Sequence, residues 1–399
     1  MKKLLKKYFG HEQFKPFQEE IINNVLERKD SFIILQTGGG KSLCYQFPAL
    51  KFKGLTLVIS PLISLMKDQV DALKSNGIAA EYINSSLSFK EIFQIQKQLL
   101  EKKIKILYVA PERLALESFR DFLRNLKMDL IAVDEAHCIS EWGHDFRPDY
   151  RNLKFIKKQF SGVPIIALTA TATPEVQKDI IKQLSLHSPK IVVSSFDRKN
   201  LSFFVFRKTG NSAFSKLIQL LERHRNESII IYCFSRKDTE NIAANLNMKG
   251  FNALPYHAGL NKETRKHNQE MFIQNNISII VATIAFGMGI DKPNIRLVVH
   301  YTFPKTLEEY YQQIGRAGRD GLPSECVLFY SYGDKIKHEY FLEQISNLNE
   351  RNHIQGKINQ IVEYCESKNC RRKFLLGYFG EKFPKKNCGA CDICLNCAS

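Results

Sequence analysis

A glycine-rich segment near the start of the chain has the residue types that hold phosphate groups. It reads QTGGGKS at residues 36–42, directly after an apolar run and before a predicted helix. Glycines let main-chain N–H groups close around phosphate oxygens, a lysine reaches the β- and γ-phosphates, and a serine hydroxyl can bind Mg²⁺. The predicted nucleotide-binding residues here are Thr37, Gly38, Gly39, Gly40, Lys41 and Ser42. The common pattern starts with glycine where this chain has Leu35, so a plain strand-to-helix turn is the alternative.

Two adjacent carboxylates open a second segment, VDEAHCISEWGHDFRPDY, at residues 133–150. A strand that ends in such a pair is where a nucleotide hydrolase holds Mg²⁺ and orients a water molecule. We therefore assign Asp134 to the metal ion and Glu135 to the attacking water, whose proton a carboxylate can accept. His137 is either a packed core residue or a sensor of the γ-phosphate. For the acid pair, a surface or helix-capping role is the alternative.

The second half of this segment combines aromatic and cationic side chains. It holds the one tryptophan of the chain, Trp142, together with Phe146, Arg147 and Tyr150. Aromatic rings stack on nucleobases and cations pair with phosphates, so we predict that this loop senses a single strand of nucleic acid. A net charge of +17, from 58 Lys and Arg against 41 Asp and Glu, also favours a polyanionic partner. The alternative is a structural loop around a buried Trp142.

A separate cationic pattern, YYQQIGRAGRDG at residues 310–321, lies in the second half of the chain. In a helix, Arg316 and Arg319 would share one face, with Gln312 on much the same side. Such a face could complete a nucleotide site across a cleft between two lobes, where an arginine stabilises the transferring phosphoryl group. A solvated basic helix face is the alternative.

Short apolar runs alternate with polar, helix-like segments, which predicts parallel sheets covered by helices. The runs fall at residues 31–35, 55–60, 104–110, 129–133, 164–170, 191–206, 227–234, 277–283, 295–301 and 325–330. A polar, glycine-containing break at residues 208–215 separates two α/β lobes. After about residue 335 the strand pattern stops, and helical periodicity leads into a cysteine cluster. We predict two α/β lobes at 1–207 and 208–338, followed by a small helical domain at 339–399.

Composition limits where the protein can act. No run approaches the roughly 18 apolar residues of a membrane span, and the N-terminus lacks the apolar core and cleavage site of a signal peptide. We therefore expect a cytoplasmic protein, in the cytosol or nucleoid of a bacterium, with no membrane partner. Of the 10 cysteines, those from Cys365 onward crowd the C-terminus. In a reducing compartment that crowding indicates metal binding rather than disulfides.

Together these segments resemble the RecQ family of superfamily 2 DNA helicases. Matching stretches include FGHEQFKPFQEEII (9–22), QTGGGKS, LVISPLISLMKDQV (57–70), YVAPERL (108–114) and ALTATAT (167–173). They continue as SFDRKNL (195–201), IYCFSRKDTE (231–240), YHAGL (256–260), VATIAFGMGIDKP (281–293), CRRKFLLGYFGE (370–381) and CGACDIC (388–394). The resemblance covers nearly the whole chain. It implies two RecA-like lobes that bind ATP and Mg²⁺ between them and move 3′ to 5′ along single-stranded DNA.

The resemblance also implies roles for single residues. Gln18 matches a glutamine that reads adenine, while Lys15 stands where many members have arginine and lacks its planar fork. The residues that match DNA-facing segments are Ser60, Pro61, Ser64, Lys67, Arg236, His257 and Thr283. Gly289 and Asp291 match a segment that approaches the nucleotide, and residues 169–171 match the motif that links hydrolysis to lobe movement. Gln313 replaces a common glutamate.

The zinc site of the family is matched by Cys370, Cys388, Cys391 and Cys394. Four thiolates suit tetrahedral Zn²⁺. Cys365 and Cys397 are left over, and Cys397 could compete as a ligand because it closes a second C-x2-C pair. We expect a structural zinc ion that fixes Arg371, Arg372 and Lys373 as a platform near DNA. A metal-free, redox-paired cluster is the alternative.

We therefore predict an ATP-dependent DNA helicase that moves 3′ to 5′ on single-stranded DNA and unwinds duplexes in recombination and repair. We expect a monomer that binds single-stranded and forked DNA, with DNA-repair proteins as further partners. We do not expect the winged-helix and RNaseD-type C-terminal domains of many relatives here, because the sequence stops five residues after Cys394. A DNA-stimulated translocase or annealing protein with weak unwinding is therefore the alternative. An RNA helicase and a nucleic-acid-binding protein regulated by ATP are the other rivals.

Overall fold

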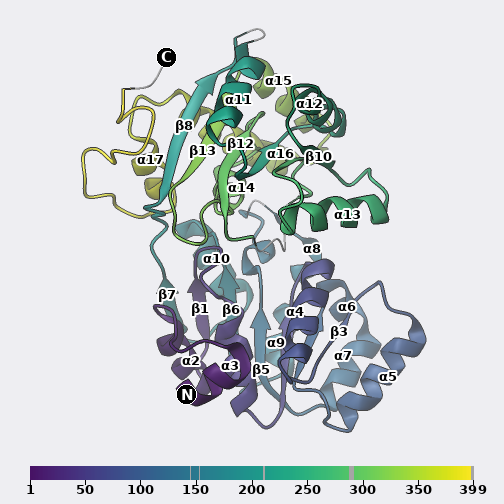
Figure 1. Ribbon diagram of the computed structural model, residues 1–399. Coiled ribbons are helices and arrows are strands. Elements are labelled where there is room, and N and C mark those ends of the chain that lie inside the picture. The colour runs from purple at the N-terminus through teal and green to yellow at the C-terminus, as the bar shows by residue number, and fades with distance from the viewer. Residues whose placement is uncertain (144, 152, 210–211, 287–291, 397–399) are drawn as a thin grey trace. The chain divides into compact units, whose positions relative to one another are not determined.

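The chain folds into two compact units, Met1–Ser195 and Phe196–Ser399. A computed structural model describes residues 1–399 except 144, 152, 210–211, 287–291 and 397–399 (Figure 1). Each unit is built on its own parallel sheet, which confirms the predicted α/β fold class. Within the described residues, no helix combines the length and the apolar character that crossing a membrane requires.

In the first unit, the described strands follow the order β3–β4–β2–β5–β6–β1–β7, all parallel. They are β1 (Ser31–Ile34), β2 (Leu55–Ile59), β3 (Ala80–Ile83), β4 (Ile106–Val109), β5 (Met128–Val133), β6 (Ile165–Thr169) and β7 (Lys190–Val193). Strands β1, β2, β4, β5 and β6 are buried along their whole length. Their unbroken apolar runs follow from this burial, because helices cover both faces of a parallel sheet.

The helices of the first unit differ in how much of their surface is buried. They are α1 (Lys2–Phe9), α2 (Gln18–Leu26), α3 (Leu43–Lys51), α4 (Ile63–Ser75), α5 (Phe89–Leu100), α6 (Pro111–Ala115), α7 (Glu117–Arg124), the 3-10 helix η1 (Ala136–Ile139), α8 (Pro148–Arg151), α9 (Lys154–Gln159) and α10 (Pro174–Gln183). Helix α3 buries seven consecutive residues, 43–49, whereas others bury one face. Helix α5 shows the one-face pattern: a capping box of Ser88 and Glu91 starts it, and Ile92, Ile95 and Leu99 form its buried face.

Neighbouring strands of this sheet end where the predicted chemistry begins. Strands β5, β6 and β1 are adjacent and parallel, so their carboxyl ends share one edge of the sheet. The acid pair follows β5, the phosphate loop follows β1, and residues 169–171 lie at the end of β6. The topology thereby brings three segments that are far apart in the sequence to one place.

In the second unit, the described strands follow the order β10–β11–β9–β12–β13–β8, again parallel. They are β8 (Leu201–Arg207), β9 (Ser228–Tyr232), β10 (Ala253–Tyr256), β11 (Ile279–Ala282), β12 (Ile295–His300) and β13 (Ser324–Tyr330). The helices are α11 (Ser212–Arg223), α12 (Arg236–Met248), α13 (Lys262–Ile273), α14 (Leu307–Ile314), α15 (Tyr332–Leu342), α16 (Leu348–Glu366) and α17 (Arg371–Tyr378).

The cysteine-rich C-terminal segment packs against β8, an edge strand of the second sheet. The main-chain N–H of Phe203 donates to Ala390 O over 3.0 Å, and the N–H of Asp392 donates to Phe203 O over 3.0 Å. These bonds form a parallel bridge between Phe203 and Cys391. Figure 1 shows the yellow C-terminal loops and α17 beside β8. The C-terminal segment is therefore continuous with the sheet.

The predicted boundary after residue 207 differs from the observed division after Ser195. Strand β8 pairs with β13 along its whole length, so residues 201–207 belong to the second sheet. The apolar run at 191–206 is thus two strands, β7 in the first unit and β8 in the second. The predicted third domain, residues 339–399, falls within the second compact unit.

Candidate functional site

The phosphate loop joins β1 to α3 and depends on its glycines. Gly38 and Gly40 have φ angles of 82° and 75°, in the left-handed region that favours glycine. A Cβ atom on Gly39 would lie 2.9 Å from a main-chain oxygen of the same loop. Lys41 Nζ donates over 3.3 Å to a main-chain oxygen just after β1, and Ser42 stands at the N-cap of α3. The loop therefore has the form of an anion site at a helix N-terminus.

Two side chains, one just before α2 and one at its first residue, bind the main chain of this loop. Gln18 is 2% exposed, and its side-chain amide donates to Gly40 O over 3.1 Å. Lys15 Nζ donates to Gly38 O over 2.9 Å. Thr37 is half-buried at the start of the turn. These contacts attach both residues to the phosphate loop, and adenine reading by Gln18 stays a prediction.

In the acid pair at the end of β5, Asp134 is buried, and Glu135 is half-buried with a strained backbone. Asp134 is 7% exposed, and its main-chain N–H continues the sheet by donating to Ile59 O over 2.8 Å. Burial and the neighbouring Glu135 carboxylate raise the pKa of Asp134 to about 7, while Lys41 lowers it. Glu135 has a φ of 47°, which is strained for a residue with a side chain. A divalent cation would keep Asp134 ionised, so this carboxylate and the Ser42 hydroxyl fit a Mg²⁺ site.

His137 connects the acid pair to the end of β6. It is 3% exposed, and its Nδ1 lies 2.8 Å from Thr169 Oγ1 and 3.3 Å from a carboxylate oxygen of Glu135. The hydroxyl of Thr169 donates in turn to Thr171 O over 3.0 Å. The residue is thus both packed and linked, and its contact with a γ-phosphate stays a prediction.

The aromatic loop, residues 138–150, exposes its tryptophan. Trp142 is 45% exposed, so the alternative of a buried structural tryptophan is wrong. Phe146 is half-buried, with the Arg151 guanidinium 5.2 Å from its ring centre. Arg151 also pairs with Glu141 over 2.5 Å. The exposed part of the indole has the chemistry to stack on a nucleobase.

Other side chains of the aromatic loop bind protein. Arg147 pairs with Asp145 at 3.1 Å and donates through Nη1 to Pro61 O over 3.1 Å. Tyr150 is fully buried, and its hydroxyl donates to Asp134 O over 3.0 Å. The expectation that Tyr150 meets nucleobases is wrong, because its ring lies in the core and its hydroxyl is used. The loop is thereby attached both to residue 61 and to the acid pair.

The predicted DNA segment of the first unit presents one cation to solvent. Lys67 is exposed on α4 and fits a phosphate contact. Ser60 is 1% exposed and Pro61 is also buried, so the fold encloses both side chains. Ser64 lies in α4, and its side chain is outside the described part of the structure. DNA contact at these positions stays a prediction.

In the second unit, two predicted DNA residues share a cavity. Arg236 is exposed at the start of α12, and Thr283 is half-buried after β11. Both line a cavity of about 450 Å³ at the carboxyl ends of β9, β11 and β12. His257 is 3% exposed, and its Nε2 lies 3.0 Å from Glu240 Oε1, so its described contact is internal. The predicted nucleotide contacts Gly289 and Asp291 lie outside the described residues.

The helical face predicted for Gln312, Arg316 and Arg319 does not form. Helix α14 ends before the arginines, and Gly318 in the following turn has a φ of 54°. Glycines stop the helix here because they adopt left-handed conformations readily. Arg316 is 8% exposed, and its charge opposes the rise that burial causes in the pKa of the Tyr232 hydroxyl, while Gln312 is half-buried at the end of α14. We call residues 315–321 the arginine turn.

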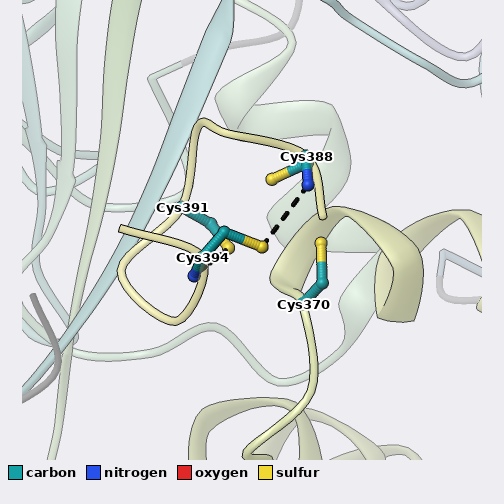
Figure 2. Close-up of side chains that lie close together, drawn as sticks. All are labelled: Cys370, Cys388, Cys391 and Cys394. Atoms are coloured by element: carbon teal, nitrogen blue, oxygen red, sulfur yellow. Dashed lines mark hydrogen bonds between the residues drawn. The ribbon is translucent and has the colours of Figure 1, made fainter. Parts of the chain in front are cut away.

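Four cysteines meet in the second unit as predicted. The Sγ atoms of Cys370, Cys388, Cys391 and Cys394 all lie within 4.8 Å of one another (Figure 2). Main-chain N–H groups donate over 3.4 Å to the sulfurs of Cys388, Cys391 and Cys394. Such outer contacts orient ligands, so this set fits a structural Zn²⁺ ion. Cys365 is buried in α16 outside the cluster, and Cys397 lies outside the described residues.

The predicted DNA platform beside the zinc site is wrong for two of its residues. Arg371 is 4% exposed and forms a two-point ion pair with Asp392, at 3.0 and 2.9 Å. Arg372 is 4% exposed and pairs with Asp197. Both guanidinium groups hold the fold, because buried groups with such partners do not reach a phosphate. Lys373 alone is exposed.

Sequence reasoning missed residues whose partners are distant in the chain. The guanidinium of Arg198 donates to main-chain oxygens of the arginine turn. Gln313 Oε1 accepts a hydrogen bond from Nε2 of the buried His300 ring over 2.7 Å, and Lys357 pairs with the buried Glu308. For Arg198, the matching stretch SFDRKNL was the signal that could have found it.

Family models match most of the chain in the order of its elements. The models are DEAD/DEAH box helicase over residues 15–180, helicase conserved C-terminal domain over 212–321 and RecQ zinc-binding over 332–395. Together with the two α/β units and the phosphate loop, they define a DEAD/DEAH-box type of helicase core followed by a zinc-binding module.

Comparison with individual relatives shows which helicase family the chain belongs to. The chain is 48% identical over 390 residues to the ATP-dependent DNA helicase RecQ of Pasteurella multocida, covering 97% of this chain and 61% of that protein. It is 44% identical over 401 residues to the putative ATP-dependent RNA helicase R290 of Acanthamoeba polyphaga mimivirus, covering 100% of this chain and 72% of that protein. The chain belongs to the RecQ family of helicases.

The chain covers only part of the length of its bacterial RecQ relatives. The chain spans 61%, 63% and 66% of the three RecQ proteins from Pasteurella multocida, Haemophilus influenzae and Bacillus subtilis. Among solved structures, the DUF1998 helicase MrfA bound to DNA superposes with a TM-score of 0.68 at 19% identity, covering 85% of this chain and 53% of that one. At this identity the likeness shows the fold.

Proposed function

We propose that this chain is an ATP-dependent DNA helicase that hydrolyses ATP with Mg²⁺ and moves 3′ to 5′ on single-stranded DNA. One observation carries the proposal: the aromatic loop that exposes Trp142 is attached to the acid pair. The link is the hydrogen bond from the Tyr150 hydroxyl to Asp134 O. A shift of the loop on binding DNA therefore reaches the group that would hold the metal ion. Such a link is what DNA-stimulated hydrolysis requires.

The chemistry falls to residues around the phosphate loop. Lys41 and the loop N–H groups bind the phosphates, and Asp134 with the Ser42 hydroxyl holds Mg²⁺, which supplies positive charge to the phosphate oxygens. Glu135 accepts the proton of the attacking water. His137 keeps this carboxylate oriented through their 3.3 Å contact. The remaining proposed nucleotide contacts are Gln18, Thr37, Gly289, Asp291, Gln312, Arg316 and Arg319.

We propose single-stranded and forked DNA as the substrate, in recombination and repair. The net charge of +17 supports a polyanionic partner, and the exposed Trp142, Lys67 and Arg236 offer stacking and phosphate contacts. The protein would act as a monomer in the bacterial cytosol or nucleoid, with DNA-repair proteins as partners.

An RNA helicase is the second candidate, because the printed name of the mimivirus relative is a putative ATP-dependent RNA helicase. Matched DNA and RNA strands of one sequence separate the two candidates in an ATPase assay. Stimulation by DNA well above that by RNA is the expected result. The reverse order would replace DNA by RNA in the proposal.

The deciding experiment measures ATP hydrolysis and strand separation together. Wild-type protein with Mg²⁺ should hydrolyse ATP faster with single-stranded DNA and open a 3′-tailed duplex but not a 5′-tailed one. Glu135→Gln should lower hydrolysis by roughly 100-fold or more, since it removes the proton acceptor. Glu101→Gln, on the exposed end of α5, is the matched control. If Glu135→Gln leaves strand separation unchanged, ATP is a regulatory ligand and the protein anneals or binds strands.

A further inference from the structure

Arg198 lies just before β8 and directs its guanidinium onto the arginine turn. Its Nη1 donates to Gly315 O over 3.3 Å, and its Nη2 donates to Ala317 O and Gly318 O over 2.8 and 2.9 Å. One planar side chain therefore holds main-chain oxygens on both sides of Arg316. Such a fork fixes several acceptors at once, which a single ammonium group cannot do.

The turn and Arg198 are both supported from behind. The side-chain amide of Asn200 donates to Gly318 O over 2.9 Å, so this oxygen has two donors. From α17, Arg372 pairs with Asp197 and donates to Arg198 O over 2.8 Å. The main chain of Arg198 is thus held by the zinc-binding part of the unit.

The local geometry allows little freedom in the turn. Gly318 has a φ of 54°, and a Cβ atom there would lie 2.4 Å from the side-chain nitrogen of Asn200. Arg198 is half-buried, and its described hydrogen bonds go to neutral main-chain oxygens. Burying a guanidinium without a carboxylate costs hydration free energy, which also lowers the pKa of this group. The hydrogen bonds that fix the arginine turn offset this loss of hydration free energy.

The Arg316 side chain lies beside a second element. Burial raises the pKa of the Tyr232 hydroxyl at the end of β9, the charge of Arg316 lowers it, and the hydroxyl donates to Phe286 O over 3.0 Å. Arg198 therefore orders the main chain that carries Arg316. Without Arg198, Gly318 O keeps Asn200 as a donor, but Gly315 O and Ala317 O lose this donor.

We propose that Arg198 is a positioning residue for ATP hydrolysis: it fixes the arginine turn so that Arg316 and Arg319 are pre-set for the transferring phosphoryl group. The inference rests on the proposed function, in which these two arginines act on that group. A residue that orders a transition-state contact affects the chemical step more than ground-state binding. Its loss should therefore lower kcat and leave the KM for ATP nearly unchanged.

The test compares Arg198→Ala, Arg198→Lys and Arg316→Ala in DNA-stimulated ATP hydrolysis, normalised to folded protein. Arg198→Ala should lower kcat by roughly 10- to 100-fold, the scale of a misplaced catalytic group. The lysine variant should fall between Arg198→Ala and wild type. Adding Arg198→Ala to a variant that lacks both arginines, Arg316→Ala/Arg319→Ala, should slow hydrolysis no further, because Arg198 acts through those two residues. Arg207→Ala, exposed at the end of β8, is the control for charge loss.

A second measurement follows the turn directly. Amide hydrogen exchange over residues 315–321 should become faster in Arg198→Ala and stay unchanged in Arg207→Ala. Unchanged exchange and kcat, or a further slowing by Arg198→Ala in the Arg316→Ala/Arg319→Ala background, would overturn the positioning role while the proposed function stands. A fall in the folded fraction with normal kcat would also overturn it. Wild-type protein without DNA-stimulated hydrolysis would overturn both.

Discussion

Two aromatic residues of the aromatic loop differ in exposure and have different roles. Tyr150 is fully buried, and its hydroxyl reaches the carbonyl of Asp134. Trp142 is 45% exposed. Aromatic rings with a polar atom suit both tasks, since the ring packs or stacks while the polar group finds one partner. The loop thus has a rigid inner end at the acid pair and an open outer end.

Trp142→Ala should weaken the response to DNA. Removing one stacking partner costs about 1–3 kcal/mol, so the DNA concentration for half-maximal ATPase stimulation should rise by roughly 10-fold. A titration of single-stranded DNA into the ATPase assay measures this. Phe89→Ala, which removes a 91% exposed ring on α5, should leave the titration unchanged. A normal titration for Trp142→Ala would exclude a sensor role for the indole.

For single residues, the sequence predicts the chemistry of a side chain better than whether that side chain points into the core or toward solvent. The phosphate loop and the acid pair are runs of consecutive residues, and their neighbouring strands place them as expected. Tyr150, Arg371 and Arg372 have the same residue types as nucleic-acid contacts, yet each is buried. Their partners lie 16, 21 and 175 residues away. No local sequence pattern predicts a hydrogen-bond or ion-pair partner at such a distance along the chain.

Among the elements, α14 and α16 are joined by a buried ion pair. Lys357 of α16 contacts Glu308 of α14, and the two residues are 9% and 2% exposed. Lys357 Nζ also donates to the Tyr378 hydroxyl of α17 over 2.8 Å. One lysine therefore connects three helices, including the helix that leads into the arginine turn.

Lys357→Met should destabilise the second unit markedly. It leaves Glu308 as a buried charge without this partner, which costs about 3–5 kcal/mol of the free energy of unfolding. Adding Glu308→Leu should recover most of the loss, because a matched apolar pair is tolerated in a buried site. Urea denaturation measures both. Lys266→Met breaks an exposed pair on α13 and should cost at most about 1 kcal/mol. A loss for the double variant equal to that of the single one would contradict this account.

Elements escaped prediction where tertiary context decides them. Strand β3 is partly exposed, so its apolar run is short. Strand β10 contains Pro255, which an edge strand tolerates because one side of its backbone is not paired. The arginine turn has helical spacing, yet its glycines end α14 first. In each case tertiary packing, rather than the local sequence pattern, determines the structure.

For the molecule as a whole, the zinc site belongs to the second unit. The two-point Arg371–Asp392 pair joins the start of α17 to the cysteine loop, and Arg372 joins α17 to the segment before β8. This is why the predicted separate domain at 339–399 does not appear as a unit of its own. The metal should therefore stabilise one unit and leave the other nearly unaffected.

Cysteine variants test this assignment. Cys388→Ser should lose zinc, because four thiolates are needed for a closed structural site, and hydrogen exchange should rise in residues 196–396 but not in 1–195. Cys365→Ser is the matched control, since Cys365 is buried outside the cluster. It should keep about one zinc ion per chain. Zinc loss in Cys365→Ser, or its retention in Cys388→Ser, would contradict the ligand set.

The main-chain bridge between Phe203 and Cys391 has a consequence for solubility. Strand β8 ends the second sheet, and the cysteine loop covers part of its open backbone. An uncovered strand edge is a template for pairing with another chain. When the metal leaves and the loop detaches, the protein should therefore self-associate before it unfolds. Bound zinc therefore prevents aggregation. Light scattering should rise when a chelator removes the zinc ion.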